Sequence, residues 1–385
     1  MKRFVQRHLP ALYHAMVNVA KRRAFGYRYH RRPDALAPIA FHTTGTHADD
    51  ARLIDRVVTS YRLRAQEASI RGAAQWTDIF DEKHSETHTS IVGGNRARVE
   101  RILRDPGSSD LFYGFDSLSR SLVRARRLDD AHAPALTLDA LATVAEAVKA
   151  RRLENPEDYR WGPTRRIAAD EVIDQLERVF GFEIPVPNPF PGERGITSKR
   201  GVLSYRVPQA LYQAWRIAQL TRGIPDPRVL EIGPGLGRTA YYARAFGIKD
   251  YTLIDVPISS FAQGYFLGRV LGEEHIHLWG ETRESDLAAK RIKLLPPAAF
   301  LGGADHYDLV VNVDSMTELD ESVARQYWAA IERRAGAFLS VNHESNPFTV
   351  GELIAKSELV ANSIRMPYWL RRGYVEEVVH FRSNR

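Results

Sequence analysis

The sequence predicts an α/β protein, in which a mostly parallel, doubly wound sheet follows an all-helical N-terminal domain. Three observations support this fold class. An apolar run at residues 228–232 breaks into a glycine cluster and resumes at helical spacing, as a strand, a turn and a helix would. Strand-like and helix-like segments then alternate to residue 382, which is typical of a parallel sheet. Residues 46–180 show helical periodicity and no strand alternation.

Length and composition fit a chain of two packed units. Its 385 residues exceed one ordinary core, and 44% of them are hydrophobic. The absence of cysteine excludes a disulfide framework and a cysteine nucleophile, and fits a cytoplasmic location. Nine of the 54 basic residues lie in the first 33 positions, which leaves 45 against 47 acidic residues elsewhere. This balance argues against a nucleic-acid partner, because tracking phosphates needs excess positive charge.

Residues 1–33 form a basic arm with apolar residues at roughly helical spacing after Pro10. No apolar stretch there is long enough to span a bilayer, and His8, His14 and Asn18 interrupt any signal-peptide core. Such an arm could dock on anionic lipid, nucleic acid or an acidic partner. The pattern favours a solvated or intrachain-packed arm, with peripheral contact at the inner membrane face as the alternative.

Residues 34–181 are expected to form the helical domain. Its predicted helices cover residues 46–68, 91–103, 137–152 and 166–180, with Thr137 as the cap of the third. Residues 182–203 are rich in proline and glycine, so they are expected to be an irregular linker or lid. A helix at 204–221 then opens the ligand-binding domain, residues 204–385.

Within residues 204–385, apolar runs and turn residues set the order of the remaining elements. Strands are expected at 228–232, 251–254, 275–279, 307–313 and 337–341, with an edge strand at 374–382. Helices are expected after Leu236, at 261–271 and at 327–334. Residues 280–303 are interpreted as a polar excursion after the third strand.

The glycine loop indicates which nucleotide is bound. Gly233, Gly235 and Gly237 are spaced two and two apart, whereas the dinucleotide fingerprint needs gaps of two and three. Arg238 stands where the third fingerprint glycine would fall. Glu231, just before the loop, would repel a pyrophosphate but suits a ligand that carries an amino group and a sulfonium. The loop therefore favours S-adenosylmethionine over NAD.

Polar residues follow each predicted strand, where an α/β sheet binds its ligands. Asp255 ends the second strand, eighteen positions after Gly237, where an acid accepts hydrogen bonds from ribose hydroxyls. The later strand ends contribute Gly280 and Glu281, then Asp314 and Ser315, then His343 and Glu344. Because the strands are parallel, these residues are expected to meet at one rim of the sheet.

Several longer stretches resemble a known family. EIGPGLGRTAYYA, YTLIDVP, AQGYFL, VVNVDSMTEL, FLSVNHESN and RMPYWLRRGYVEEVV are similar to class I S-adenosylmethionine-dependent methyltransferases, and more narrowly to bacterial sugar O-methyltransferases. The resemblance implies a Rossmann-like methyltransferase domain, with Gly280 and Glu281 near adenine and Asn312, Asp314 and Ser315 beside the methionine moiety. It also implies a saccharide or glycan acceptor, and a role in glycan or glycolipid biosynthesis.

A neutral sugar hydroxyl is a poor nucleophile, so a base is expected near the acceptor. His343 is the leading candidate, because its intrinsic pKa suits proton acceptance at neutral pH. Asp314 is second, as the base or as the group that orients His343, and Glu344 and Glu318 are weaker candidates. The competing interpretation is a histidine whose hydrogen bonds are satisfied by backbone at a strand end.

Two further questions stay open. Asp314, Glu318 and Glu344 could bind a divalent metal such as Mg²⁺ through oxygen, but no tight ligand pattern supports this, so no metal site is predicted. The alternatives to a sugar are a non-sugar small-molecule acceptor, or a non-catalytic protein that binds S-adenosylmethionine and uses its helical domain for interactions. Candidate sugar-contact residues are Tyr113, Phe115, Asp116, Tyr205, Arg206, Gln209, Tyr368, Trp369, Arg371 and Arg372.

Overall fold

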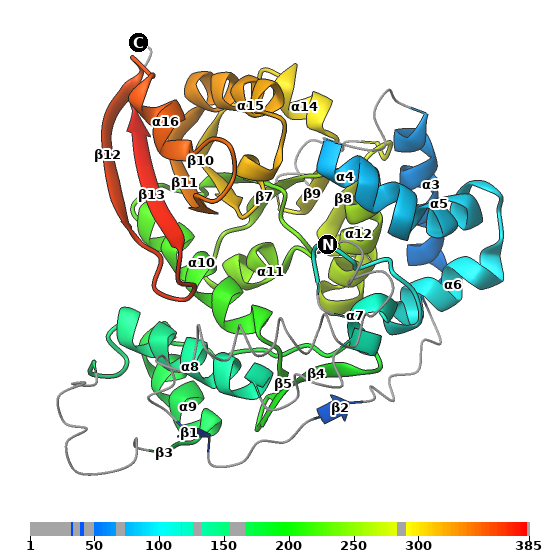
Figure 1. Ribbon diagram of the computed structural model, residues 1–385, viewed down its shortest axis with the longest axis horizontal. Coiled ribbons are helices and arrows are strands. Elements are labelled where there is room, and N and C mark those ends of the chain that lie inside the picture. Colours follow the sequence, from blue (N-terminus) through cyan, green and yellow to red (C-terminus); the bar gives the residue numbers. More distant parts are fainter. Residues whose placement is uncertain are drawn as a thin grey trace, which may run out of the picture. The chain divides into compact units, whose positions relative to one another are not determined.

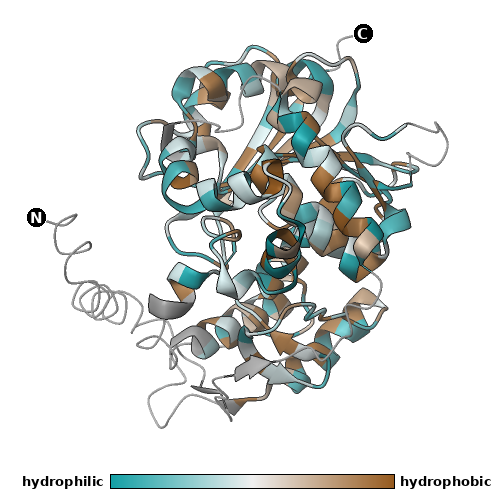
Figure 2. Cartoon of the chain, turned by 90° about the vertical axis from the view of Figure 1, so that its right-hand side faces the viewer, coloured by the Kyte–Doolittle hydropathy of each residue, from teal (hydrophilic) through white to brown (hydrophobic). Residues whose placement is uncertain are grey.

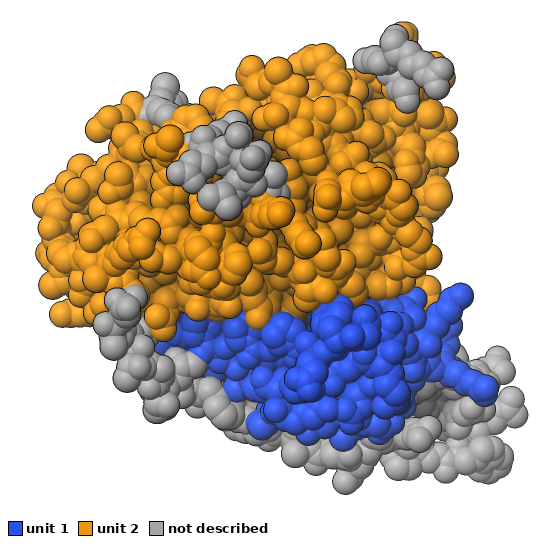
Figure 3. All heavy atoms as spheres, turned by 180° about the vertical axis from the view of Figure 1, so that it is seen from behind, with its two compact units in different colours: residues 1–45, 105–212 blue, residues 46–104, 213–385 orange. Residues whose placement is uncertain are grey.

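The computed structural model describes residues 32–33, 39–41, 50–66, 74–116, 118–125, 132–153, 166–282 and 290–382. Nearly all of the predicted basic arm, residues 1–33, lies outside these ranges. The chain divides into two compact units (Figure 3): unit 1 comprises residues 1–45 and 105–212, and unit 2 comprises residues 46–104 and 213–385. Among the described residues, no helix is long and apolar enough to cross a membrane.

Unit 2 is built on an eight-stranded sheet with the order β12-β13-β11-β10-β6-β7-β9-β8 (Figure 1). Its strands are β6 (Arg228–Ile232), β7 (Asp250–Ile254), β8 (Ile276–Leu278), β9 (Ile292–Leu295), β10 (Tyr307–Val313), β11 (Ala335–His343), β12 (Val360–Pro367) and β13 (Tyr374–Phe381). All neighbouring strands pair in parallel, except that β13 runs antiparallel to β11 and to β12. The mostly parallel, doubly wound sheet is confirmed.

Helices and short helical turns connect and cover these strands. They are α3 (Ala51–Ala65), α4 (Ala74–Ile79), the π-helical turn η1 (Phe80–His84), α5 (Ser85–Val92), α6 (Arg96–Arg104), α11 (Arg238–Ala245), α12 (Pro257–Leu271), η5 (Glu273–His275), α14 (Pro297–Leu301), η6 (Met316–Glu318), α15 (Glu321–Arg334) and α16 (Val350–Ala355). The central strands are buried along nearly their whole length, as is typical of parallel strands that helices cover on both faces. Figure 2 shows the hydrophobic residues on the strands and on the helices packed against them.

The predicted boundary of the helical domain is wrong. Residues 46–104 belong to the unit that holds the large sheet, and the division from unit 1 falls inside α10 (Arg206–Leu220). The physical reason lies in α12, where Gly264 and Gly268 leave room for α3. A Cβ at Gly264 would stand 2.9 Å from Val57, and one at Gly268 would stand 2.5 Å from Leu53. Helix α3 therefore packs on the sheet domain, although α12, which it covers, begins 192 residues after α3 ends.

Two strands of unit 2 were missed by the sequence interpretation. β9 lies within the supposed polar excursion of residues 280–303, and it separates β7 from β8. At four residues, it is too short to show a period. β12 lies outside β13, so β13 is not the edge strand. Most residues of β12 are exposed, which explains its lack of an apolar pattern.

Unit 1 mixes helices with short strands, whereas the helical N-terminal region that the sequence predicts is found within residues 51–92 of unit 2. Unit 1 holds η2 (Pro106–Ser108), α7 (Arg120–Ala125), α8 (His132–Ala147), α9 (Ala169–Phe180), β1 (Arg32–Pro33), β2 (Ile39–Phe41), β3 (Arg166–Ile167), β4 (Glu193–Ser198) and β5 (Gly201–Leu203). β1 pairs with β3, and β4 lies between β2 and β5. The supposed irregular linker, residues 182–203, thus contains an antiparallel hairpin. Gly195 permits it, because a Cβ there would stand 1.8 Å from the carbonyl oxygen of Leu203.

Several predicted helices have different limits in the structure. The one predicted at 166–180 begins at Ala169, because residues 166–167 form β3. The described part of the first begins at Ala51, after the N-cap Asp50. The helix predicted at 91–103 is two helices, α5 and α6, because Gly93 and Gly94 interrupt it and Gly94 has a φ of +75°. Thr137 lies within α8 rather than at its start.

Candidate active site

The carboxyl ends of β6, β7, β10 and β11 form one rim of the sheet. Their register places Ile232 beside both Ile254 and Asn312, and Val313 beside Val341. The chain passes from β6 to β7 on one side and reaches β10 on the other, so this rim is the topological switch point. We call the part after β6 and β7 the glycine-loop side, comprising Glu231, residues 233–237 and Asp255. The acid–histidine side comprises Asp314, Glu318 and His343.

The glycine loop has the tight geometry that its sequence predicts. Gly233, Gly235 and Gly237 all have positive φ, at +65°, +59° and +83°. The Gly233 N–H donates to the Ile254 carbonyl at 2.9 Å, which holds the loop against β7. A Cβ at Gly233 would stand 2.3 Å from the Ser315 hydroxyl, so the backbone passes too close for any side chain there. Gly237 then caps the start of α11.

Glu231 is buried within the sheet, with 1% of its surface exposed. One carboxylate oxygen accepts a hydrogen bond from the Tyr251 hydroxyl at 2.9 Å. Burial raises the pKa of Glu231 to about 7, and the nearby charge of Asp255 adds to this, while hydrogen bonds from Tyr251 and Thr239 oppose it. A cation bound near Glu231 would therefore favour the ionised form of its carboxyl group.

Asp255 follows β7, as predicted, and is held by short hydrogen bonds. Its carboxylate accepts from the Val256 N–H and from the Gln263 side chain, each at 2.7 Å. Burial raises the pKa of Asp255 to about 6, against these hydrogen bonds and the charge of Arg64. Gln263 also donates to the Gly235 carbonyl at 2.7 Å, so it ties Asp255 to the glycine loop.

Gln263 and Arg64 are site residues that the sequence interpretation missed. Gln263 lies in the stretch AQGYFL, whose resemblance was the only signal for it. Arg64 is on α3, is 2% exposed, and donates to the carbonyl of Asp255 and, at 3.4 Å, to that of Leu295. Arg64 thus links the ends of β7 and β9. It is 191 positions before Asp255 in the sequence, and local sequence patterns do not indicate contacts at such separations.

Asn312 and Ser315 hold the rim together through hydrogen bonds within the protein. The Asn312 amide donates to the Ile232 carbonyl at 3.0 Å and to the Ser315 hydroxyl at 2.6 Å. Its oxygen accepts from the Met316 N–H at 3.1 Å and from Asn342 at 2.9 Å. Asn312 is fully buried. Both residues therefore connect β6 to β10. They lie at the strand end where the sequence predicts them, and their hydrogen bonds there are to other protein groups.

Three other predicted cofactor residues lie in different surroundings. Arg238 is 8% exposed, and its guanidinium lies 5.1 Å from the ring centre of Phe266 on α12. Gly280 and Glu281 follow β8, which is the outermost strand. Glu281 accepts two hydrogen bonds from Arg56 of α3, at 2.7 and 3.1 Å. Burial acts to raise the pKa of Glu281, but the hydrogen bonds and charge of Arg56 outweigh it and lower that pKa.

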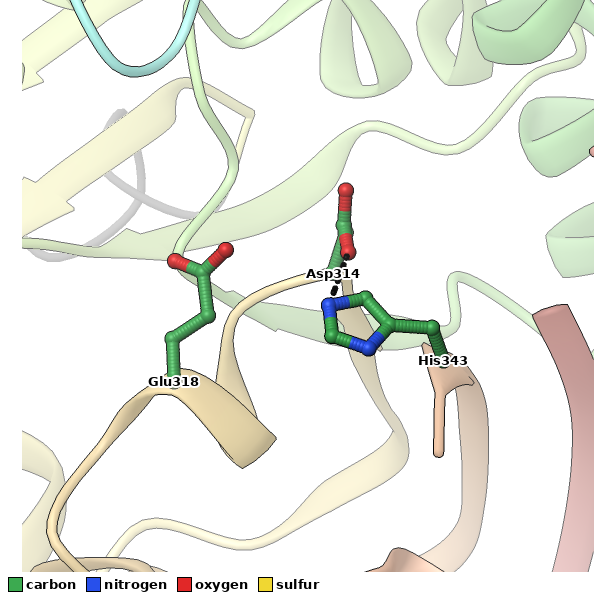
Figure 4. A group of neighbouring side chains, drawn as sticks. All are labelled: Asp314, Glu318 and His343. Atoms are coloured by element: carbon green, nitrogen blue, oxygen red, sulfur yellow. Dashed lines mark ion pairs between the residues drawn. The ribbon is translucent and has the colours of Figure 1, made fainter. Parts of the chain in front are cut away.

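On the acid–histidine side, Asp314 has a left-handed backbone, with a φ of +56°. Its N–H donates to the Val341 carbonyl at 2.8 Å, which fixes the residue against β11. Its Oδ2 accepts a hydrogen bond from Arg371 at 2.7 Å. Its Oδ1 is buried, has no hydrogen-bond partner and lies 3.8 Å from His343 Nε2 (Figure 4).

His343 ends β11 and is held from two directions. Its Nδ1 lies 2.7 Å from the Ser345 hydroxyl, and its ring meets Tyr374 edge-on at 5.4 Å between centres. The Arg371 guanidinium lies 3.7 Å from the centre of the same Tyr374 ring. The Ser345 backbone N–H also donates to Nδ1 at 3.3 Å, so the imidazole has both a backbone partner, as in the competing interpretation, and side-chain neighbours.

Glu318, on η6, completes the acid–histidine side. One ligand atom from each of Asp314, Glu318 and His343 lies within 4.8 Å of the others, so the three could hold a metal ion. Glu344, predicted beside His343, instead forms an ion pair in which Arg365 donates to both of its oxygens at 2.8 Å. Arg365 lowers the pKa of Glu344, so this carboxylate is a poor base.

No family model matches the chain, and no curated protein matches it. Among solved structures, a glycopeptide N-methyltransferase is similar at 16% identity over 45% of this chain and 90% of its own, with a TM-score of 0.33. Magnesium protoporphyrin IX methyltransferase from Synechocystis PCC 6803, solved with bound SAM, is 11% identical over 46% of this chain and 83% of its own, with a TM-score of 0.33. At such identities and TM-scores, these likenesses assign neither cofactor nor acceptor.

Proposed function

We propose that this protein is an S-adenosylmethionine-dependent O-methyltransferase that methylates a sugar hydroxyl, in glycan or glycolipid biosynthesis. The observation that carries the proposal is the pairing of two sites on one rim. A glycine loop flanked by a buried and a half-buried carboxyl group lies beside a half-buried acid and histidine, at the switch point of a doubly wound sheet.

The glycine-loop side supports a cationic nucleoside. Asp255 is placed to accept hydrogen bonds from ribose hydroxyls, and Glu231 offers negative charge to the amino-acid end of the ligand. Burial raises the pKa of both carboxyl groups, so a bound cation is the natural partner that would keep them ionised. A dinucleotide pyrophosphate would add like charge to this pair.

The acid–histidine side supports acceptance of a proton. The acceptor oxygen would attack the methyl carbon in line with the bond to sulfur, that bond would break, and neutral S-adenosylhomocysteine would leave. The hydroxyl proton would pass to His343, whose Nε2 lies 3.8 Å from Asp314 Oδ1, while Arg371 holds Asp314 through Oδ2. A positioned base of this kind contributes about 10²–10⁴-fold to the rate.

Support for a sugar acceptor comes from the resemblance of residues 338–346 and 365–379 to sugar O-methyltransferases. It also comes from the loop between β12 and β13, which carries Arg371 to the cluster and presents Trp369 with 54% of its surface exposed. An exposed aromatic face on this loop suits a sugar ring. A non-sugar small molecule is the runner-up acceptor, and a non-catalytic cofactor-binding protein is the alternative of a different class.

Transfer of labelled methyl to a panel of acceptors tests the proposal. We expect S-adenosylmethionine to bind in calorimetry, and label to appear on a saccharide but not on non-sugar alcohols or nucleic acid. Mass spectrometry of surface glycans from cells with and without the gene should show the loss of one methyl group. Cofactor binding without transfer to any acceptor would favour the non-catalytic alternative, and label on a non-sugar compound would favour the runner-up.

A further inference from the structure

We infer that Asp314, Glu318 and His343 form a binding site for one divalent transition-metal ion (Figure 4). The three residues come from different elements: the end of β10, the turn η6 and the end of β11. This inference rests on the proposed function for the position of the acceptor beside the site. The composition of the cluster itself does not depend on that function.

The donor atoms fit a metal in chemistry and in spacing. Two carboxylates and one imidazole are common ligands of divalent ions. Asp314 Oδ1 points into the cluster, is closed to solvent and lacks a hydrogen-bond partner, which is costly for a carboxylate oxygen. It lies 3.8 Å from His343 Nε2, and two ligands of one ion at about 2.1 Å each stand roughly 3–4 Å apart. Glu318, whose side chain is long and rotatable, is within 4.8 Å.

The surrounding groups hold the ligands in the orientation that a metal site requires. Arg371 binds Asp314 Oδ2 at 2.7 Å, which leaves Oδ1 directed at the cluster. The Ser345 N–H donates to His343 Nδ1 at 3.3 Å, and the Ser345 hydroxyl lies 2.7 Å from the same atom. A metal ion at Nε2 would place the ring proton on Nδ1, where the Ser345 hydroxyl can accept it. Histidine ligands in metal sites usually donate their second ring N–H to such a partner, and carboxylate ligands are usually hydrogen-bonded as well.

The ligand set also indicates the class of ion. Mg²⁺ and Ca²⁺ prefer oxygen ligands throughout, whereas an imidazole nitrogen favours first-row transition ions. The mixed set therefore suits Mn²⁺, Fe²⁺ or Zn²⁺ better than the Mg²⁺ considered from sequence. The ligand set considered from the sequence contained Glu344, whereas the cluster in the structure contains His343 instead, because Glu344 is paired with Arg365.

Ligation changes the role of one residue in the proposed reaction. A divalent ion beside the acceptor would lower the pKa of its hydroxyl. His343 would then hold the ion, and the hydroxyl proton would pass to a water molecule instead of to His343. If His343 is a metal ligand, Glu318 is a ligand of the same ion. If His343 is the base, Glu318 has no part in proton transfer.

Calorimetry and electron paramagnetic resonance of the full chain with Mn²⁺ test the site directly. We expect one bound Mn²⁺ per chain, and weakening of its affinity by about tenfold or more in Glu318→Gln. Glu321→Gln is the matched control, because Glu321 is a nearby exposed acid that pairs with Arg325 outside the cluster. Circular dichroism checks that both variants fold.

Absence of Mn²⁺ binding up to about 1 mM would overturn the inference, as would equal affinity in Glu318→Gln and wild type. Selective binding of Mg²⁺ over Mn²⁺ and Zn²⁺ would overturn the assigned class of ion. Failure of the proposed function is seen separately, as the absence of S-adenosylmethionine binding or of methyl transfer. Metal binding is measured without either.

Discussion

The two sides of the rim are built in opposite ways. On the glycine-loop side, Glu231 is buried and Asp255 is half-buried, and both are hydrogen-bonded to neighbouring strands and helices. On the acid–histidine side, Asp314, Glu318 and His343 are partly exposed, and Asp314 keeps one oxygen without a hydrogen-bond partner. The first arrangement is a preformed cradle, whereas the second leaves polar atoms open to a ligand. We therefore expect changes on the first side to alter cofactor affinity, and changes on the second to alter turnover.

The largest effect is expected from His343→Ala. It should lower the methyl-transfer rate by about 10²–10⁴-fold, because the imidazole acts on the acceptor as a base or as a metal ligand. Cofactor affinity measured by calorimetry should stay within about twofold. His275→Ala, at a half-exposed histidine beyond α12, is the control. Retained turnover would remove His343 from the reaction, and a lost cofactor site would show that the two sides are not separate.

A smaller effect is expected from Gly233→Ala on the glycine-loop side. The new Cβ would meet the Ser315 hydroxyl at 2.3 Å, on a backbone with a φ of +65°. Loss of stability by about 2–3 kcal/mol should follow, together with weaker cofactor binding. The matched variant Gly247→Ala has a φ of +91° but nothing within 4 Å, so it should cost only about 1 kcal/mol. Equal unfolding free energies for the two variants would disprove the steric argument.

A third prediction concerns pH. The affinity for S-adenosylmethionine should rise about tenfold between pH 6 and pH 8, as Glu231 ionises with its pKa of about 7. Asp255, with a pKa of about 6, should add a step at lower pH. Calorimetry across this range measures the slope.

The Glu231→Gln variant provides the control, because it should lose the upper step and keep the lower one. The ligand-free protein should show the opposite trend in stability. A carboxyl group whose pKa is raised by folding binds its proton more tightly in the folded state, so stability falls as pH rises from about 4.5 to 7. An affinity that is flat with pH would mean that neither carboxyl group ionises on binding.

The smallest effect is expected from Glu281→Gln. The family resemblance places Glu281 near adenine, but the structure pairs it with Arg56. We therefore expect cofactor affinity to change by less than about twofold, and stability to fall by about 1 kcal/mol. Calorimetry and thermal denaturation measure the two quantities. A tenfold loss of affinity would return Glu281 to the cofactor site.

Local pattern made much of the sheet domain predictable. The strands β6 and β10 were predicted with their observed limits, because a strand buried on both faces is rich in apolar residues. The glycine loop was predictable for a similar reason, since its positive φ angles are accessible mainly to glycine. The short strand β9 and the exposed strand β12 carried no such pattern, and the hairpin of unit 1 was hidden by its prolines and glycines.

The sequence by itself determined the doubly wound sheet, the turn that precedes α11 and the acids at the ends of β6 and β7, because these depend on neighbours within a few residues. Only the tertiary structure decided that α3 joins the sheet domain, that Arg365 removes Glu344 from the cluster and that Glu318 faces Asp314 and His343. Such pairings follow from the order of strands in the sheet and from close packing between distant helices. Neither strand order nor packing between distant helices produces a periodic pattern in the sequence.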